Sequence, residues 1–285
     1  HLAGTSWQSM TSYDMMGMGS AVVHNLVIDI PPDIMMGTSG TVTLNGAFRV
    51  TGVLTLSQGT LSLQGILTLG PAAAITGPLS PSARIDTWYD GRVVKEFEAD
   101  QTFTIPFGLY NGSTPVTLTL SGGTYAPGAA VSIRSVSSKH PNLNSSSNFL
   151  NRYWSLNQIG ISGFSANLSF TYLDTDVVGL ESFIYGRQYS GGVWTQLGLA
   201  DPDSNQITAT VTSFSDFTGG PEVLPLVSAT YADPAGLCGG NTPCYPSAQM
   251  AIDAVEVGHT ATLYPGAYAE SLTIDRDVTV ALAGN

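Results

Sequence analysis

The chain has 285 residues, of which 43% are hydrophobic and only 11% are charged, and its formal net charge is −12. This acidic balance argues against binding to nucleic acid, whose phosphates require a basic patch, and against binding to anionic lipid. No apolar run reaches the ~20 residues of a membrane-spanning helix. Glycine (32) and proline (16) are plentiful, which is typical of an all-β extracellular protein with many short strands and turns.

Residues 1–83 are expected to hold an N-terminal segment and then a repeat. Glycine recurs at a step of about six residues, and apolar and polar residues alternate between the glycines. The glycines of this series are Gly40, Gly46, Gly52, Gly59, Gly65, Gly70 and Gly77. Alternation with a period of two indicates strands. We interpret the region as a small β-solenoid with a tight turn at each corner, and a meander of hairpins is the alternative.

Residues 84–222 lose the glycine step. Their strand-like runs are longer and richer in aromatic residues, as in Val116–Leu120, Ala166–Tyr172 and Val193–Leu197. Turns fall at intervals of about ten residues, which predicts a β-sandwich of about seven or eight strands.

Residues 223–285 show a third pattern. A short amphipathic helix is expected around Ala251–Val255, and three short strands are expected around His259–Tyr268, Glu270–Ile274 and Val278–Leu282. This order predicts a helical cap and a partial parallel β-helix, whose coils bury their apolar faces only against one another. The fold class predicted for the whole chain is therefore all-β.

Cys238 and Cys244 enclose only Gly-Gly-Asn-Thr-Pro. A closely spaced, even pair in a chain of secreted composition predicts a disulfide, whereas a zinc site needs more ligands than this pair offers.

Several of these runs resemble a known class of proteins. Val42–Gly46, Leu54–Leu63 and Ile75–Gly77 resemble repeats in large secreted surface proteins of the type IX secretion class. Phe103–Gly108 and Asn151–Leu156 resemble the domain that commonly follows such repeats.

The tail resembles the start of pectate-lyase-like β-helix regions in adhesin-like proteins, on the residues Cys238–Cys244 and Tyr264–Glu270. The resemblance implies a surface or matrix component that lies outside the cell after removal of a leader. Some such proteins act on carbohydrates. The long β-helix and the C-terminal sorting domain that usually follow are absent from this sequence.

The function that we expect is self-assembly, because both terminal regions are rich in short strands whose partners are missing from the pattern. The expected assembly edges are Val22, Val27, Leu272, Ile274, Val278 and Val280. Between Thr38 and Leu79 the only charged residue is Arg49, although charges normally guard such edges. Copies of the chain joined by strand addition or end-to-end stacking would form a filament, a sheath or a surface matrix.

Two alternatives stay open. A carbohydrate-binding adhesive module would present Trp88 and Trp194 as stacking platforms for a cell-surface or matrix polysaccharide, although aromatic residues in strands commonly form the core. The other alternative is a non-catalytic fragment of a polysaccharide-active β-helix enzyme.

The sequence contains no catalytic triad, phosphate loop or dinucleotide motif, so we predict no enzymatic activity.

No cofactor is predicted. His1, His24 and the methionines around them form a candidate copper site, with packing as the favoured interpretation. Asp201–Asn205 matches the first half of a calcium loop but lacks the glycine and the glutamate that complete one, so a hairpin turn is favoured. Asn111 and Asn144 match the glycosylation pattern in predicted loops.

Overall fold

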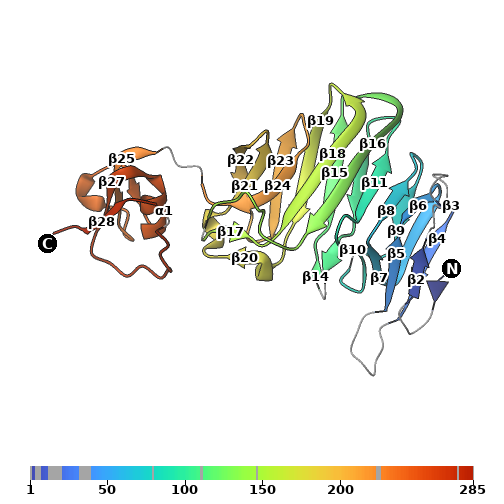
Figure 1. The fold of residues 1–285 in the computed structure, drawn as a ribbon, viewed down its shortest axis with the longest axis horizontal. Coiled ribbons are helices and arrows are strands. Elements are labelled where there is room, and N and C mark those ends of the chain that lie inside the picture. Colours follow the sequence, from blue (N-terminus) through green and yellow to red (C-terminus); the bar gives the residue numbers. More distant parts are fainter. Residues whose placement is uncertain are drawn as a thin grey trace. The chain divides into compact units, whose positions relative to one another are not determined.

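The computed structural model of the chain describes residues 2–3, 8–11, 21–31, 40–78, 80–109, 112–145, 147–222, 226–274 and 276–284 (Figure 1). The prediction of an all-β protein is confirmed, because strands dominate these ranges and α1 (Ala248–Ala254) is their single α-helix. None of their helices is long and apolar enough to cross a membrane. The chain forms two compact units: His1–Leu143 with Phe149–Gly220, and Asn144–Asn148 with Pro221–Asn285.

Four windings of parallel strands begin the first unit. The first holds β1 (Leu2–Ala3), β2 (Gln8–Thr11) and β3 (Ala21–Val23), and the second holds β4 (Leu26–Asp29), β5 (Thr41–Asn45) and β6 (Ala47–Val50). The third holds β7 (Val53–Leu63) and β8 (Ile66–Leu69), and the fourth holds β9 (Ala74–Thr76), β10 (Ala83–Thr87) and β11 (Arg92–Glu96). Each strand pairs in parallel with its counterpart in the next winding, and the long β7 serves two ladders.

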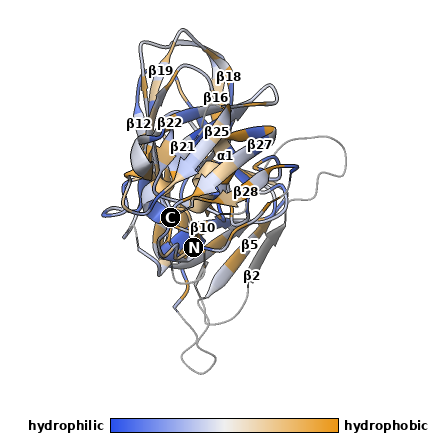
Figure 2. Ribbon diagram, turned by 90° about the vertical axis from the view of Figure 1, so that its left-hand side faces the viewer, coloured by the Kyte–Doolittle hydropathy of each residue, from blue (hydrophilic) through white to orange (hydrophobic). Residues whose placement is uncertain are grey.

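Alternation of apolar and polar residues decides which side chains face the interior of the windings. Val42 and Leu44 of β5 are fully buried, whereas Thr41 and Thr43, which alternate with them, are half-buried on the outer face. Hydrophobic and paler segments accordingly alternate along β5 in Figure 2. Successive side chains of a strand point to opposite faces, so the interior is filled by leucine, isoleucine, valine and phenylalanine.

The glycine step marks corners of the windings. Val42 pairs with Leu61 and Phe48 pairs with Leu67, so a strand and its partner are three glycine steps apart rather than one. At one corner Gly65 lies directly on Gly46, and a Cβ atom added to Gly65 would meet the Gly46 carbonyl oxygen at 1.9 Å. A side chain at this corner would therefore push two windings apart.

Replacing Gly65 with alanine is expected to lower the free energy of unfolding of the first unit by about 1–3 kcal/mol, the usual cost of overpacking. Gly65 does not have a positive φ, so an alanine there adds steric crowding without backbone strain. Gly198→Ala is the control, because its nearest atom would be 3.9 Å away. Urea denaturation of both variants measures the difference, and equal midpoints would contradict the stacking of corners.

The ladder of β3, β6, β8 and β11 continues into antiparallel strands. β11 pairs in parallel with β8 and antiparallel with β16 (Thr124–Val136). The resulting nine-stranded sheet has the order β22-β21-β24-β18-β16-β11-β8-β6-β3. The regions predicted as residues 1–83 and 84–222 thus share one sheet. In the fourth winding the outer side of β11 is paired with β16 of the same chain.

A four-stranded sheet packs on the antiparallel part of this large sheet. Its order is β12-β15-β19-β23, made of Thr102–Ile105, Val116–Ser121, Ser165–Thr171 and Gln206–Val211. The ring of Trp154 on β18 (Tyr153–Ser162) stacks on Phe170 of β19 at 4.7 Å between centroids. Phe170 in turn lies 5.2 Å from Phe217 on β24 (Asp216–Gly220). Aromatic side chains from the two sheets therefore form a shared core.

The remaining elements of the first unit are short or lie at its edges. They are β13 (Gly108–Leu109), β14 (Gly112–Ser113), β17 (Phe149–Leu150), β20 (Val177–Val178), β21 (Tyr185–Ser190), β22 (Val193–Leu199) and the 3-10 helices at Asp174–Asp176 and Glu181–Phe183.

The second unit is a small parallel sheet with a helix packed on it. Its strand order is β26-β25-β27-β28, made of Cys244–Tyr245, Val227–Ala232, Val255–Leu263 and Thr279–Leu282. All three pairings are parallel. Helix α1 contributes Ala248, Ala251 and Ile252 to the core beneath it.

One strand expected in this unit is absent, since Glu270–Ile274 has no strand partner. The side-chain amide of Gln249 takes the place of a strand: its Nε2 donates to the carbonyl of Thr273 at 3.0 Å, and its Oε1 accepts from the Thr273 N–H at 2.8 Å. Glu270 caps α1, accepting from Ser247 Oγ and from the Ala248 N–H at 2.7 Å each. Side chains of α1 and its cap therefore hold this segment in place.

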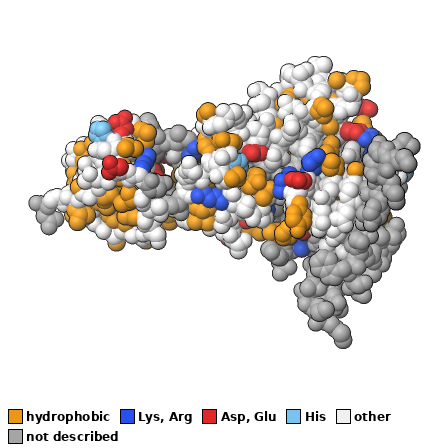
Figure 3. Space-filling view, in the orientation of Figure 1, with side chains coloured by type: hydrophobic (Ala, Val, Ile, Leu, Met, Phe, Trp, Pro, Cys, Tyr) orange, Lys and Arg blue, Asp and Glu red, His pale blue; other side chains and the backbone are white. Residues whose placement is uncertain are grey.

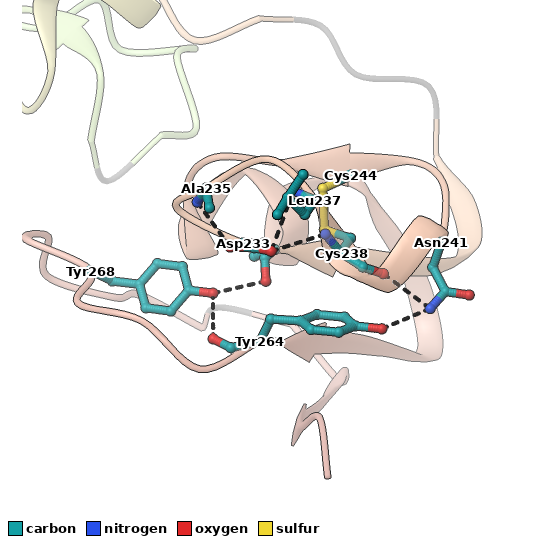
Figure 4. Close-up of a disulfide and its surroundings, with 9 residues drawn as sticks. Asp233, Ala235, Leu237, Cys238, Asn241, Cys244, Tyr264 and Tyr268 are labelled. Atoms are coloured by element: carbon teal, nitrogen blue, oxygen red, sulfur yellow. Dashed lines mark hydrogen bonds between the residues drawn. A yellow bond between two sulfur atoms is a disulfide. The ribbon is translucent and has the colours of Figure 1, made fainter. Parts of the chain in front are cut away.

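The predicted disulfide between Cys238 and Cys244 is present, with its Cα atoms 5.8 Å apart (Figure 4). Asp233 organises the loop that carries Cys238, since its carboxylate accepts the N–H groups of Ala235 at 2.8 Å and Cys238 at 2.9 Å. These bonds hold the pKa of Asp233 below its usual value. The Tyr268 hydroxyl donates to the carbonyl of Ala232 at 2.8 Å, so side chains as well as the disulfide fasten this loop.

Candidate functional site

A groove runs over the outer face of β5, β7 and β10 and encloses about 350 Å³. The residues that line it are Thr41, Thr43, Thr60, Ser62, Gln64, Arg84, Asp86, Trp88, Tyr89 and Leu109. Almost all are polar or aromatic, because the inward positions of the same strands hold the apolar core. Alternation along three neighbouring strands therefore produces both the core and the groove.

The walls of this groove contain polar groups with unused hydrogen-bonding capacity. Thr60 is only 2% exposed and Arg84 only 6% exposed. Thr60 Oγ1, Arg84 Nε and Asp86 Oδ1 are buried without a hydrogen-bond partner in the described part of the chain. An unpaired buried polar atom costs about 1–3 kcal/mol, so this cluster is expensive to maintain.

Burial also decides the electrostatics of the groove. It raises the pKa of Asp86, and hydrogen bonds with Ser62 and Trp88 and the charge of Arg84 oppose this shift only in part. Burial likewise lowers the pKa of Arg84. Both side chains are thus poorly solvated, and a polar ligand would compensate for the missing water.

Trp88 and Tyr89 are the aromatic residues among those that line the groove. The turn that carries them is held by the Trp88 N–H, which donates to the carbonyl of Leu63, and by the Gly91 N–H, which donates to the carbonyl of Trp88. Trp88 is 43% exposed and Tyr89 is 75% exposed. Tyr89 adopts a φ of 54°, which is rare for a residue with a bulky side chain. The fold therefore holds two large aromatic side chains at the surface instead of burying them.

Trp194, the second predicted stacking residue, does not line this groove. It lies on β22, its ring centroid is 5.0 Å from that of the buried His140, and its indole N–H donates to the carbonyl of Asn142 at 3.0 Å. His140 also contacts Tyr153 and Tyr189, and its Nε2 lies 3.1 Å from a carboxylate oxygen of Asp216. Trp194 therefore helps to enclose a buried histidine.

A larger pocket of about 920 Å³ lies beside Arg152 and Asp176. Arg152 Nε and Nη2 donate to the two carboxylate oxygens of Asp176 at 2.7 and 3.2 Å, and Nη1 donates to Ser135 Oγ at 3.2 Å. These buried charges satisfy one another, so they fasten the fold and leave little hydrogen-bonding capacity for a ligand.

The expected assembly edges occupy different positions. Val22 lies on β3, the terminal strand of its sheet, and is 61% exposed. Val27 lies on β4, which pairs with β1 at Ile28 and Asp29 and with β7 on its other side, and Val27 itself pairs with Thr55 of β7. Its role as an assembly edge stays a prediction.

In the second unit, Val280 lies on the terminal strand β28, and Val278 immediately precedes it. Both side chains are partly buried against the core. Leu272 and Ile274 belong to the irregular segment fixed by Gln249, and they are 44% and 52% exposed.

The candidate metal residues do not assemble into a site where the structure describes them. Of the candidate copper ligands, His1, Met15, Met16, Met18, Met35 and Met36 lie outside the described residues. Of the two candidate glycosylation sites, Asn111 also lies outside them and Asn144 is exposed. His24 Nδ1 lies 3.1 Å from Thr51 Oγ1. Asp201 closes a turn by accepting from Ser204 Oγ at 2.6 Å and from the Asp203 N–H at 3.0 Å. The described ranges contain no group of three or more histidine, cysteine or acidic residues placed to hold a metal ion.

Comparisons with known proteins give no match to a family model, to a curated protein or to a solved structure. The resemblance to secreted surface proteins therefore stays a prediction.

Sequence reasoning missed Arg84 and Asp86, although a signal was present. Residues 84, 86 and 88 alternate along one strand and its end, so they share a face.

Proposed function

We propose that the chain is an extracellular structural protein whose copies join end to end by extending their parallel ladders. The supporting observation is that β1, β2 and β3 end the ladders of the first unit, and β28 ends the ladder of the second, with no further partner in the described residues. The unpaired N–H and C=O groups of such strands pair readily with another chain.

The chemistry of these edges favours association. Neither β3 nor β28 contains a charged residue, and Leu282 on β28 is 82% exposed. Charged side chains are few and scattered on the face that Figure 3 shows. Contact between the first unit of one copy and the second unit of the next is a heterologous contact, and such a contact produces a filament when the rotation between copies does not close a ring. The disulfide supports an oxidising, extracellular location.

Placing a lysine on either edge is expected to suppress assembly. The wild-type protein should form larger species as its concentration rises, and Val22→Lys or Leu282→Lys should raise the concentration required by about tenfold, because a buried ammonium is costly. Light scattering after size-exclusion chromatography measures the species, and electron microscopy shows their form.

Ile159→Lys is the matched control. Ile159 is 69% exposed but pairs within the sheet with Ala130, so its lysine variant should assemble like the wild type. A wild-type protein that stays monomeric at its highest soluble concentration would refute the proposal. Equal effects of all three lysines would show that net charge, rather than the edges, controls association.

A further inference from the structure

The groove on β5, β7 and β10 contains polar groups that take no part in the proposed strand addition. Its orphaned polar atoms come from a hydroxyl, a guanidinium and a carboxylate, namely Thr60, Arg84 and Asp86. A hydroxyl of a ligand can both donate and accept a hydrogen bond, so a polyol can satisfy such a mixed set, whereas a simple ion cannot.

Trp88 adds an apolar surface beside these polar groups. Trp88 is 43% exposed and directly follows β10. A sugar ring has the complementary make-up, with C–H groups on its faces and hydroxyls at its rim, so it can stack on indole while its hydroxyls reach polar side chains. Gln64 is an exposed amide that lines the same groove.

Charge indicates the class of sugar. Among the described residues that line the groove, Asp86 is the only carboxylate and Arg84 is the only cation, and the carbonyl of Pro81 partly engages Arg84. The whole chain has a net charge of −12. A uronic acid or a sulfated sugar would meet repulsion from the protein without a free cation to offset it.

We propose that this groove binds a neutral saccharide, with Trp88 as the stacking platform and with Asp86 and Arg84 as hydrogen-bonding partners for its hydroxyls. The site is independent of the assembly edges, so a monomeric protein would keep it. As part of a filament, the same groove would attach each subunit to a neutral polysaccharide.

A glycan array with neutral and uronic-acid oligosaccharides tests the proposal, using the full chain at a dilution at which it is monomeric. The wild-type protein should bind at least one neutral glycan and no purely acidic one. Calorimetry with the bound oligosaccharide should show at least tenfold weaker binding for Trp88→Ala and for Asp86→Asn. Trp88→Phe should retain part of the affinity, because it keeps an aromatic face.

Leu180→Ala is the matched control, since Leu180 is also 43% exposed and does not line the groove. Its affinity should equal that of the wild type. Absence of binding to every neutral glycan would overturn the proposal, and so would preference for acidic glycans or unchanged binding by both Trp88→Ala and Asp86→Asn. If Trp88→Ala does not fold, the conservative Asp86→Asn and Trp88→Phe variants decide. Failure here would leave the assembly experiment unaffected.

Discussion

Replacing Asp176 with alanine is expected to lower the free energy of unfolding of the first unit by about 3–5 kcal/mol. Arg152 is 2% exposed, and Asp176 is its only charged partner in the described residues. The variant would leave a guanidinium buried without a counter-charge. It would also remove the acceptor for the Leu173 N–H, which Asp176 binds at 2.9 Å.

The double variant Arg152→Met with Asp176→Leu is expected to be much more stable than the single variant, because no charge remains buried. Urea denaturation followed by tryptophan fluorescence reports on the first unit, since all tryptophans of the chain lie within its ranges. Asp174→Ala is the control, because Asp174 is exposed and should change stability by less than about 0.5 kcal/mol. A loss below about 1 kcal/mol in Asp176→Ala would mean that water reaches Arg152 readily.

The first unit should become more stable, not less, as the pH rises from 7 to 9.5. Lys95 is fully buried inside the windings, and its Nζ donates to the carbonyls of Gly70, Pro71 and Glu96 at 2.9, 2.6 and 2.8 Å. Burial lowers the pKa of Lys95 from 10.5 to about 8, although the charges of Glu96 and Glu98 oppose the shift. The folded protein therefore gives up this proton at a lower pH than the unfolded chain.

The sign follows from proton linkage. Between about pH 8 and pH 10.5 the unfolded chain binds a proton that the folded chain has released, so the free energy of unfolding increases with pH. The gain between pH 7 and 9.5 should be about 2 kcal/mol. Below pH 8 both states are protonated and the cost of burying the ammonium is present in full.

Urea denaturation at several pH values up to 9.5 measures this gain, and Lys95→Met should give a flat profile. Higher pH is avoided, because burial raises the pKa of Tyr125 and Tyr172 and these phenols oppose the effect once their unfolded forms ionise. A wild-type profile that falls over this range would show that the three carbonyls stabilise the ammonium more than burial penalises it.

The candidate site illustrates how far local patterns reach. The sequence predicts Trp88 as a stacking residue from its type alone, and Trp88 is one of the residues that line the groove. Trp194 has the same type but packs against His140. Nothing local distinguishes the two, because exposure depends on what the rest of the chain brings against each ring.

Sequence alone determined the features that depend on neighbouring residues. Period-two alternation predicted strands, two closely spaced cysteines predicted the disulfide, and the glycine step predicted a repeat with tight corners. Each is a local property, because Cβ direction, loop closure and backbone crowding are decided within a few residues.

Only the tertiary structure decided which strand pairs with which. Backbone hydrogen bonds carry no sequence label, so alternation could not show that a winding spans three glycine steps or that β11 joins the windings to β16. It also could not show that Gln249 would occupy the place of a strand beside Thr273. The polar groove likewise exists only because β5, β7 and β10 lie side by side, a contact between residues far apart in the chain.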